Sequence, residues 1–329
     1  MGRPNATILD AEGLRLTAAE AAFFREADPF GFILFGRNID TADQIRALCD
    51  DMRTAVGREA PILIDQEGGR VQRIWPPLAR QWPAPLDFVA SAGANAERAM
   101  YLRARLIAAD LIGYGIDTNC APMLDLARPD THPFLRNRCY GEDPDTVAAL
   151  GRATADGLLD GGVLPVAKHM PGHGLARSDS HHVLPRVTAD PEALWDMDFA
   201  PFQALNDLPM GMTAHIVFEQ IDSDPATLSP EMIRLIREDI GFDGVLMTDD
   251  SSMKALSGTP ADITRAALAA GCDLVLYCNQ PLEARRAVAD AAGPLSDAAF
   301  ARTERALAAR QPAKPLDIAA AEAELDALM

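Results

Sequence analysis

The chain has 329 residues, a length at which an α/β barrel commonly forms as one unit. Hydrophobic residues make up 48% of it, so a large core can be buried without disulfides or a structural metal. The 48 acidic side chains exceed the 30 basic ones, which leaves a net charge of −18. Because such a surface repels phosphate backbones and anionic lipid headgroups, the composition argues against nucleic acid or a membrane as partner.

The cysteines and the N-terminal segment both bear on the compartment. The five cysteines are odd in number and lack CxxC spacing, so we expect reduced thiols in the core. The first residues, MGRPNATILDAEG, contain no apolar stretch long enough for a signal peptide. Nowhere in the sequence do about 18 apolar residues run together, which is the length that a membrane-spanning helix needs. These features predict a cytoplasmic protein, and we expect it to be a monomer.

Eight short apolar runs alternate with longer helical patterns along the chain. Such runs are typical of strands that are buried on both faces of a parallel sheet. The predicted strands are Ala6–Leu9, Gly31–Phe35, Ile62–Ile64, Asp117–Ala121, Pro165–Lys168, Met210–Ala214, Gly244–Thr248 and Asp273–Tyr277. The alternation predicts a single (β/α)8 TIM-type barrel, with an open doubly wound sheet as the alternative. We expect residues 1–329 to form one domain, with a C-terminal helical segment from about residue 315.

Helix signals lie between the predicted strands. Thr41, Asp190 and Ser229 are residues that favour the N-cap of a helix, and each precedes a helical pattern. Gly241 follows such a pattern and predicts a helix end. The helices therefore fall where a barrel needs them, between consecutive strands.

Polar side chains directly follow several of the apolar runs, at the ends where a parallel barrel gathers its functional groups. Lys168 and His169 follow one run, His215 follows another and Asp249 follows a third. A longer polar segment, DQEGGRVQR at 65–73, comes after Ile64. The sequence therefore predicts a functional site at this end of the barrel.

The segment KHMPGHGLARSDSHH at 168–182 holds four of the six histidines. Pro171 and the glycines of this loop prevent a helix, so His169 and His173 cannot be metal ligands one helical turn apart. A zinc site would need a further ligand from the same loop, and it remains an alternative that the spacing does not favour.

Asp179 and His181 lie two residues apart in this loop. At this spacing in an extended chain, a carboxylate can reach an imidazole and fix its tautomer. The pair would then act as a proton shuttle.

Several segments of the chain resemble the β-N-acetylglucosaminidases of glycoside hydrolase family 3, the bacterial enzymes of cell-wall recycling. The KH-x-PGHG and DSH pair is the most specific of these segments, because it separates the hexosaminidases from the broader β-glucosidase group. Met170 and Thr248 stand where the family more often has an aromatic residue and Ser. The matching segments are ILFGRN at 33–38, DQEGGRVQR at 65–73, APMLDL at 121–126, KHMPGHG with DSH at 168–181, MTAH at 212–215, GFDGVLMTDDSSM at 241–253 and GCDLVLYCN at 271–279.

The resemblance implies a catalytic mechanism that retains the anomeric configuration through a covalent glycosyl-enzyme intermediate. It assigns the nucleophile to Asp249 and the general acid/base to His181, with Asp179 as its partner. An imidazole suits this role, because it can both give and take a proton near neutral pH. His182 directly follows and remains an alternative for the proton shuttle.

The resemblance also assigns Asp65, Arg73, Arg138, Lys168 and His169 to sugar binding. Asp65 and the Lys168–His169 pair follow predicted strands, where they can reach sugar hydroxyls. Arg73 and Asp65 can instead pair with each other, and both roles can hold together.

The implied reaction is hydrolysis of terminal, non-reducing β-linked N-acetylglucosamine, from GlcNAc-anhydroMurNAc muropeptides in peptidoglycan recycling. The implied partner is a small amino-sugar substrate, with neither a metal nor another cofactor. Three alternatives stay open at this point: a phosphate-dependent β-glycoside phosphorylase, a catalytically inactive sugar-binding barrel, and a metal-dependent hydrolase.

Overall fold

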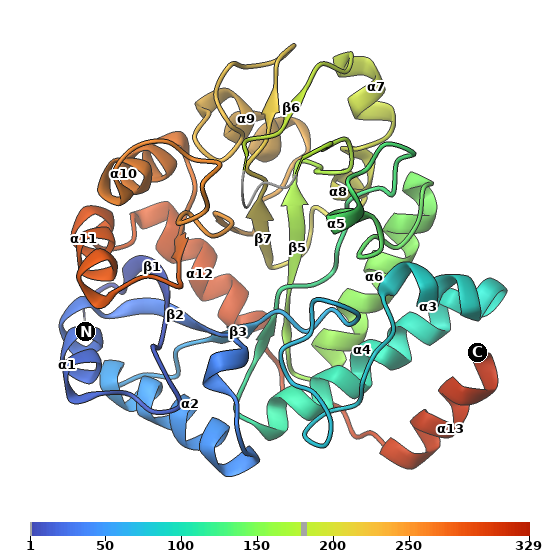
Figure 1. The fold of residues 1–329 in the computed structure, drawn as a ribbon, viewed down its shortest axis with the longest axis horizontal. Coiled ribbons are helices and arrows are strands. Elements are labelled where there is room, and N and C mark those ends of the chain that lie inside the picture. The colour runs from blue at the N-terminus through green and yellow to red at the C-terminus, as the bar shows by residue number, and fades with distance from the viewer. Residues whose placement is uncertain (1, 179–182) are drawn as a thin grey trace.

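The computed structural model describes residues 2–178 and 183–329. Its centre is a parallel barrel (Figure 1) made of β1 (Asn5–Asp10), β2 (Pro29–Leu34), β3 (Ile62–Ile64), β4 (Thr118–Asn119), β5 (Leu164–Met170), β7 (Met210–Thr213), β9 (Val245–Met247) and β10 (Val275–Tyr277). Each of the eight predicted strands corresponds to one of these.

Pairing around the barrel follows the chain from β1 to β9, and β10 pairs with β1. The circle closes between β9 and the residues just before β10. There, Met247 and Leu274 form a parallel bridge, and the N–H of Thr248 donates to the carbonyl of Leu274 at 3.0 Å. The prediction of a (β/α)8 barrel is therefore confirmed, and the alternative of an open doubly wound sheet is wrong.

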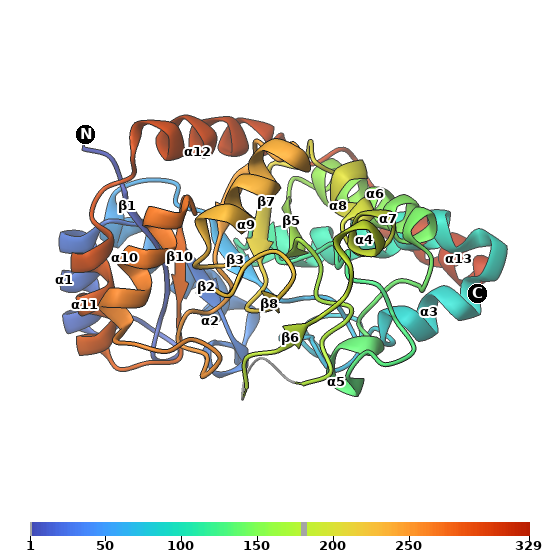
Figure 2. The same cartoon turned by 90° about the horizontal axis from the view of Figure 1, so that it is seen from above.

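The helices surround the barrel (Figures 1 and 2). They are α1 (Ala18–Ala27), α2 (Ala42–Val56), α3 (Pro85–Ala92), α4 (Ala96–Gly113), α5 (Pro133–Arg136), α6 (Pro144–Asp160), α7 (Pro191–Asp196), α8 (Ala200–Ala204), α9 (Pro230–Arg234), α10 (Pro260–Ala270), α11 (Leu282–Ala292), α12 (Asp297–Ala309) and α13 (Ile318–Leu328). The short strands β6 (Arg186–Val187) and β8 (Val217–Phe218) pair in parallel outside the barrel.

The predicted helix caps are present. The side chains of Thr41, Asp190 and Ser229 accept hydrogen bonds from backbone N–H groups in the first turns of α2, α7 and α9. These contacts satisfy donors that have no partner within the helix. Gly241, with a φ of +83°, follows the helical segment that begins with α9.

The core has two layers, because successive side chains of a strand point to opposite faces. In β2, Ile33 points into the barrel, while Phe32 and Leu34 pack outward against the helices. Leu295 and Ala299, just before and within α12, join the inner layer, so α12 covers one end of the barrel (Figure 2).

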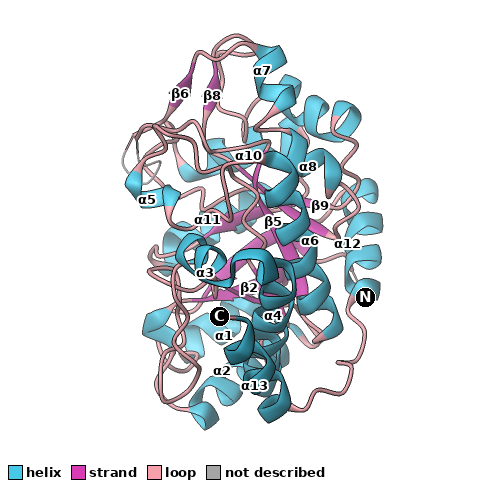
Figure 3. Cartoon of the chain, turned by 90° about the vertical axis from the view of Figure 1, so that its right-hand side faces the viewer, coloured by secondary structure: helices cyan, strands magenta, loops and turns pink. Residues whose placement is uncertain are grey.

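Helix α13 packs against α4 (Figure 3). Arg98 of α4 and Glu324 of α13 form an ion pair of 2.7 Å. The five cysteines are buried and reduced, as predicted. Among the helices that the structure describes, none is long and apolar enough to cross a membrane.

Candidate active site

A cavity of about 350 Å³ lies at the carboxyl ends of the barrel strands. Its volume is at the small end of the range for ligand pockets, which suits one sugar-sized group. The predicted residues that line it are Asp65, Arg73, Arg138, Lys168, His169 and Asp249. The other predicted site residues, Asp179 and His181, lie outside the described residues, as does His182.

Asp65 follows β3 and lies between two cations. Its Oδ1 accepts from Nζ of Lys168 at 2.9 Å, and its Oδ2 accepts from Nη2 of Arg73 at 3.0 Å. The pairing of Arg73 with Asp65 that the sequence left open is therefore present. Because Asp65 and Arg73 also line the cavity, the pair can bind a ligand as a unit.

Glu67, which sequence reasoning did not select, joins these groups. Its Oε1 accepts from Nζ of Lys168 at 2.6 Å and from Nη2 of Arg138 at 2.8 Å. Its Oε2 accepts from Nε of Arg138 at 3.0 Å, which completes a bidentate carboxylate–guanidinium pair. The Lys168 ammonium is thus held between the carboxylates of Asp65 and Glu67.

Burial and opposite charge compete in this cluster. Burial favours the neutral acids, but Arg138 and Lys168 outweigh it and lower the pKa of Glu67 to about 2. At Asp65, burial is likewise outweighed by Lys168 and Arg73, so the pKa of Asp65 lies well below its usual range. The two carboxylates in turn raise the pKa of Lys168 against the effect of burial. All of these groups carry their charges at neutral pH.

Asp125 is a second group that sequence reasoning did not select. It is fully buried, and its Oδ2 lies 2.7 Å from Nδ1 of His169. Its Oδ1 accepts from the backbone N–H of His173 at 2.7 Å. His173 also lines the cavity, and burial lowers the pKa of its imidazole to about 4, so the ring is neutral at neutral pH.

Asp249 and Asp250 follow β9, and both line the cavity. Asp249 Oδ1 accepts from the N–H of Asp250 at 2.8 Å. Oδ1 of Asp250 accepts from the backbone N–H groups of Ser252 at 3.0 Å and Cys278 at 3.3 Å. Asp250 therefore stabilises the loop after β9, while the Asp249 carboxylate lies at the cavity wall.

His215 follows β7 but does not belong to the cavity lining. Its Nδ1 lies 2.8 Å from Oγ1 of Thr227, and its Nε2 lies 3.1 Å from the carbonyl of Asp250. Since both ring nitrogens have protein partners, His215 is a structural link beneath the site.

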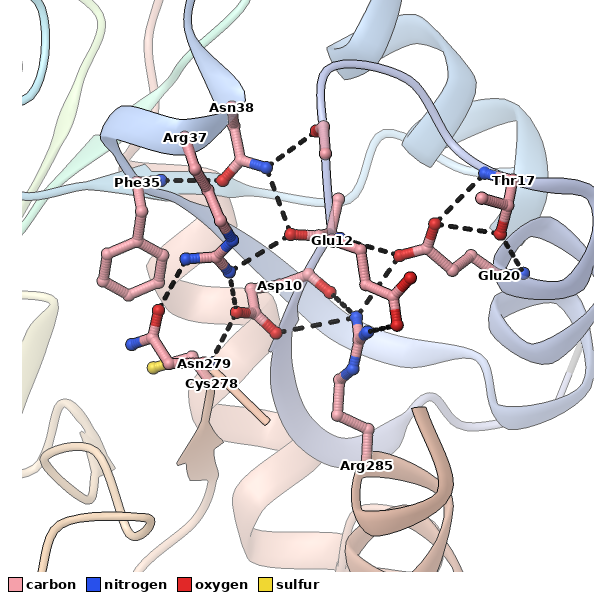
Figure 4. A network of polar contacts seen from close by, with 12 residues as sticks. Asp10, Glu12, Thr17, Glu20, Phe35, Arg37, Asn38, Cys278, Asn279 and Arg285 are labelled. Atoms are coloured by element: carbon pink, nitrogen blue, oxygen red, sulfur yellow. Dashed lines mark hydrogen bonds and ion pairs between the residues drawn. The ribbon is translucent and has the colours of Figure 1, made fainter. Parts of the chain in front are cut away.

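A buried polar network supports the cavity wall at the end of β1 (Figure 4). Asp10 accepts from Arg37 and from the N–H of Asn279, the latter at 2.7 Å. Arg285 of α11 lies 3.6 Å from the same carboxylate. The Arg37 guanidinium lies 5.0 Å from the ring centre of Phe35, and Phe35 and Asn279 both line the cavity. The network thus holds the loops after β2 and β10 together where they border the site.

The site combines a placed carboxylate, hydrogen-bond donors of fixed charge and the imidazoles of His132, His169 and His173 at the carboxyl end of the barrel. Among the described residues, no group of three or more His, Cys, Asp or Glu side chains is arranged to hold a metal ion. This fold and site define a (β/α)8 barrel protein with a cavity for a polar ligand at the carboxyl ends of its strands. Residues 9–307 match the family model described as Glycosyl hydrolase family 3 N terminal domain, and the chain belongs to this family.

Relatives narrow the class further. A Beta-hexosaminidase from Chromobacterium violaceum is 38% identical over 91% of this chain and 85% of its own length. The crystal structure of NagZ from Neisseria gonorrhoeae in complex with N-trifluoroacetyl-D-glucosamine matches with a TM-score of 0.88 and 29% identity, over 99% of this chain and 98% of that one. A Beta-N-acetylhexosaminidase from Beutenbergia cavernae matches with a TM-score of 0.76 and 28% identity, over 93% and 96%. The chain is accordingly a glycoside hydrolase of the β-hexosaminidase type, as predicted.

Proposed function

We propose that the chain is a retaining exo-glycosidase that releases terminal, non-reducing β-linked N-acetylglucosamine. We further propose that its substrates are GlcNAc-anhydroMurNAc muropeptides of peptidoglycan recycling. The observation that carries the proposal is the convergence of Asp249 with Asp65, Arg138, Lys168 and His169 on one cavity of about 350 Å³. A cavity of this size accommodates one sugar ring, which favours cleavage from a chain end.

In the proposed mechanism, the Asp249 carboxylate attacks the anomeric carbon and forms a covalent glycosyl-enzyme as the bond to the leaving oxygen breaks. His181, paired with Asp179, gives its proton to that oxygen. It then takes a proton from the water that attacks the anomeric carbon and releases Asp249. Both dyad residues lie outside the described residues, so their roles rest on the sequence motif.

The five binding residues supply complementary polar contacts. Lys168, Arg73 and Arg138 donate hydrogen bonds, Asp65 accepts them, and the His169 imidazole can do either, so together they can recognise several sugar hydroxyls. The N-trifluoroacetyl-D-glucosamine bound by the Neisseria gonorrhoeae relative supports an amino sugar as the ligand of this cavity.

The proposal extends to the whole chain and its setting. Residues 1–329 would act as a single catalytic barrel unit, as a monomer and without a cofactor. A cytoplasmic location is supported by the buried, reduced cysteines, since disulfides are rare in that compartment.

The test is release of p-nitrophenol from its β-N-acetylglucosaminide by the wild type and by Asp249→Ala, with the β-glucoside as paired substrate. We expect fast release from the GlcNAc compound alone and at least a 1,000-fold loss, about 4 kcal/mol, in the variant. Near-normal rates in Asp249→Ala would contradict the assignment of the nucleophile.

Phosphorolysis is examined with the same assay, repeated with and without inorganic phosphate. The proposal expects free GlcNAc as the product in both conditions. Formation of GlcNAc-1-phosphate would establish the phosphorylase alternative instead.

A further inference from the structure

Asp125 and His169 form a buried carboxylate–imidazole pair inside the site, in addition to the Asp179–His181 pair of the motif. Asp125 is placed by the segment after β4, which runs beside β5: Met123 forms a parallel bridge with Lys168, and the N–H of Leu124 donates to the carbonyl of Lys168 at 2.8 Å. This pairing brings Asp125 under the turn that begins at His169.

Among the residues that the structure describes, the Asp125 carboxylate accepts hydrogen bonds from the 169–173 turn alone. Oδ2 lies 2.7 Å from Nδ1 of His169, and Oδ1 accepts from the N–H of His173 at 2.7 Å. The N–H of His169 lies 3.3 Å from both oxygens. An ionised carboxylate has only acceptors, so the hydrogen between these groups belongs to Nδ1 of His169.

The opposite edge of the ring has a different environment. His169 lines the cavity, and within the described chain no protein group bonds its Nε2. With the hydrogen on Nδ1, the Nε2 of a neutral ring carries a bare lone pair. This lone pair is an acceptor for a ligand in the cavity.

Lys168, the preceding residue, supplies the complementary group. Its ammonium is held by Asp65 at 2.9 Å and Glu67 at 2.6 Å, and it can only donate. A hydroxyl group both accepts and donates hydrogen bonds, so a donor next to an acceptor recognises it more specifically than two donors would.

We propose that Asp125 is a positioning residue that fixes His169 in the Nδ1–H tautomer, so that Nε2 accepts a hydrogen bond from a hydroxyl of the bound sugar. The inference deepens the proposed function and rests on the cavity being the sugar site. Asp125 itself acts through His169 and does not touch the substrate.

Asp125→Asn separates the two contacts of this side chain. The amide oxygen can keep the hydrogen bond from the N–H of His173, while the amide NH₂ replaces the oxygen that faces Nδ1 of His169. Because that NH₂ can only donate, the hydrogen of the ring moves to Nε2 and the acceptor is lost. By analogy with carboxylates that orient metal-binding histidines, we expect kcat/KM for the p-nitrophenyl substrate to fall by about 10- to 100-fold.

The tautomer is measured by ¹⁵N–¹H NMR of the imidazoles, with the His169 signals assigned by their loss in His169→Ala. We expect the Nδ1–H form in the wild type and the Nε2–H form in Asp125→Asn. An Nε2–H ring or a doubly protonated ring in the wild type at the assay pH would overturn the proposal. This measurement does not depend on turnover, so it stands even if the proposed reaction is wrong.

The matched control is Asp117→Asn. Asp117 is also buried and accepts from a backbone N–H, that of Ile62 at 2.8 Å, and from Arg53 at 2.9 Å, but it precedes β4 and lies outside the cavity lining. We expect this variant to lower stability while leaving kcat/KM and the His169 signals unchanged. In a His169→Ala background, Asp125→Asn should reduce kcat/KM less than twofold further; a full additional loss would show that Asp125 does not act through His169.

Discussion

Glu67 is the carboxylate that compensates the buried positive charges of Lys168 and Arg138. It is almost fully buried, and its two oxygens make three contacts with Lys168 and Arg138. Without its charge, Arg138 would lose the one carboxylate with which it pairs among the described residues, and of the carboxylates described there Lys168 would keep Asp65. Breaking a buried ion pair by removing one partner is strongly destabilising, because the remaining charge loses both water and its partner.

We therefore predict that Glu67→Gln lowers the free energy of unfolding at pH 7 by about 3 kcal/mol. The variant should also raise KM, since Lys168 and Arg138 lose a fixed anchor. The pKa of Glu67 is lowered to about 2, so its contribution is complete above its ordinary value near 4.5 and is lost as the pH falls toward 2. Urea unfolding at several pH values measures this difference between the wild type and the variant.

Glu324→Gln provides the comparison for this prediction. Glu324 also pairs with an arginine, Arg98, but about half of each side chain is exposed. Exposed ion pairs contribute little to stability, so we expect the free energy of unfolding and KM of Glu324→Gln to stay close to those of the wild type. Equal effects of the two substitutions would contradict the special role given to Glu67.

At this scale, the sequence predicted the residues that directly follow strands. Asp65, Lys168 and Asp249 were found because the carboxyl ends of barrel strands meet around one site. Glu67 could have been found too, since it lies two residues after Asp65 and an extended chain turns both side chains to one face. Asp125 could not, because its contact with His169 depends on how the segment after β4 runs alongside β5.

At the scale of elements, α8 and the loop after β5 meet at a buried carboxyl group. Asp198 precedes α8 and is 2% exposed, and neither of its carboxyl oxygens has a hydrogen-bond partner among residues 2–178 and 183–329. The loop backbone passes directly over it: a Cβ on Gly174 would lie 3.0 Å from Oδ1, and one on Gly172 would lie 2.7 Å from the Asp198 carbonyl. Only glycine allows the loop to come this close.

Burial raises the pKa of Asp198 to about 6, with Asp125 adding to the rise and Arg128 opposing it. A raised carboxyl pKa means that the folded state holds the proton more tightly than the unfolded chain. The protein therefore loses up to about 3 kcal/mol of stability as the pH rises from 4 through 6. We predict that Asp198→Asn is more stable than the wild type at pH 8 and gains nothing at pH 4.

Thermal unfolding of both proteins across this pH range tests the prediction, because the difference between them removes the contributions of other titrating groups. If the difference in stability between the wild type and Asp198→Asn does not change with pH, then folding does not raise the pKa of Asp198.

The strands and helices themselves were largely predictable, while the outer pair of strands was not. Buried apolar runs and capping residues such as Thr41 carry a local signal, and the barrel elements form where that signal lies. Strands β6 and β8 have two residues each, too few for any periodicity. They exist because the loops after β5 and β7 run side by side, which the sequence does not encode locally.

At the scale of the whole molecule, the barrel forms the cavity, while the C-terminal helix α13 only adds to stability. The residues that line the cavity all fall between Ile33 and Asn279, and α13 contributes none of them. Helix α13 covers α4 with Ala321 and Leu325, both nearly fully buried. Its ion pairs with Arg98 of α4 and with Arg80, in the segment before α3, are partly exposed and add little.

We predict that deletion of residues 317–329 lowers the melting temperature without changing KM for the p-nitrophenyl substrate. Exposing Leu325, Ala321 and the facing surface of α4 costs about 2–3 kcal/mol, which corresponds to a fall of about 5 °C in a protein of this size. Leu325→Ala should produce much of that fall alone, since it opens the same contact. A change in KM after the deletion would mean that the helix shapes the cavity through α4, and the barrel alone would then not account for the site.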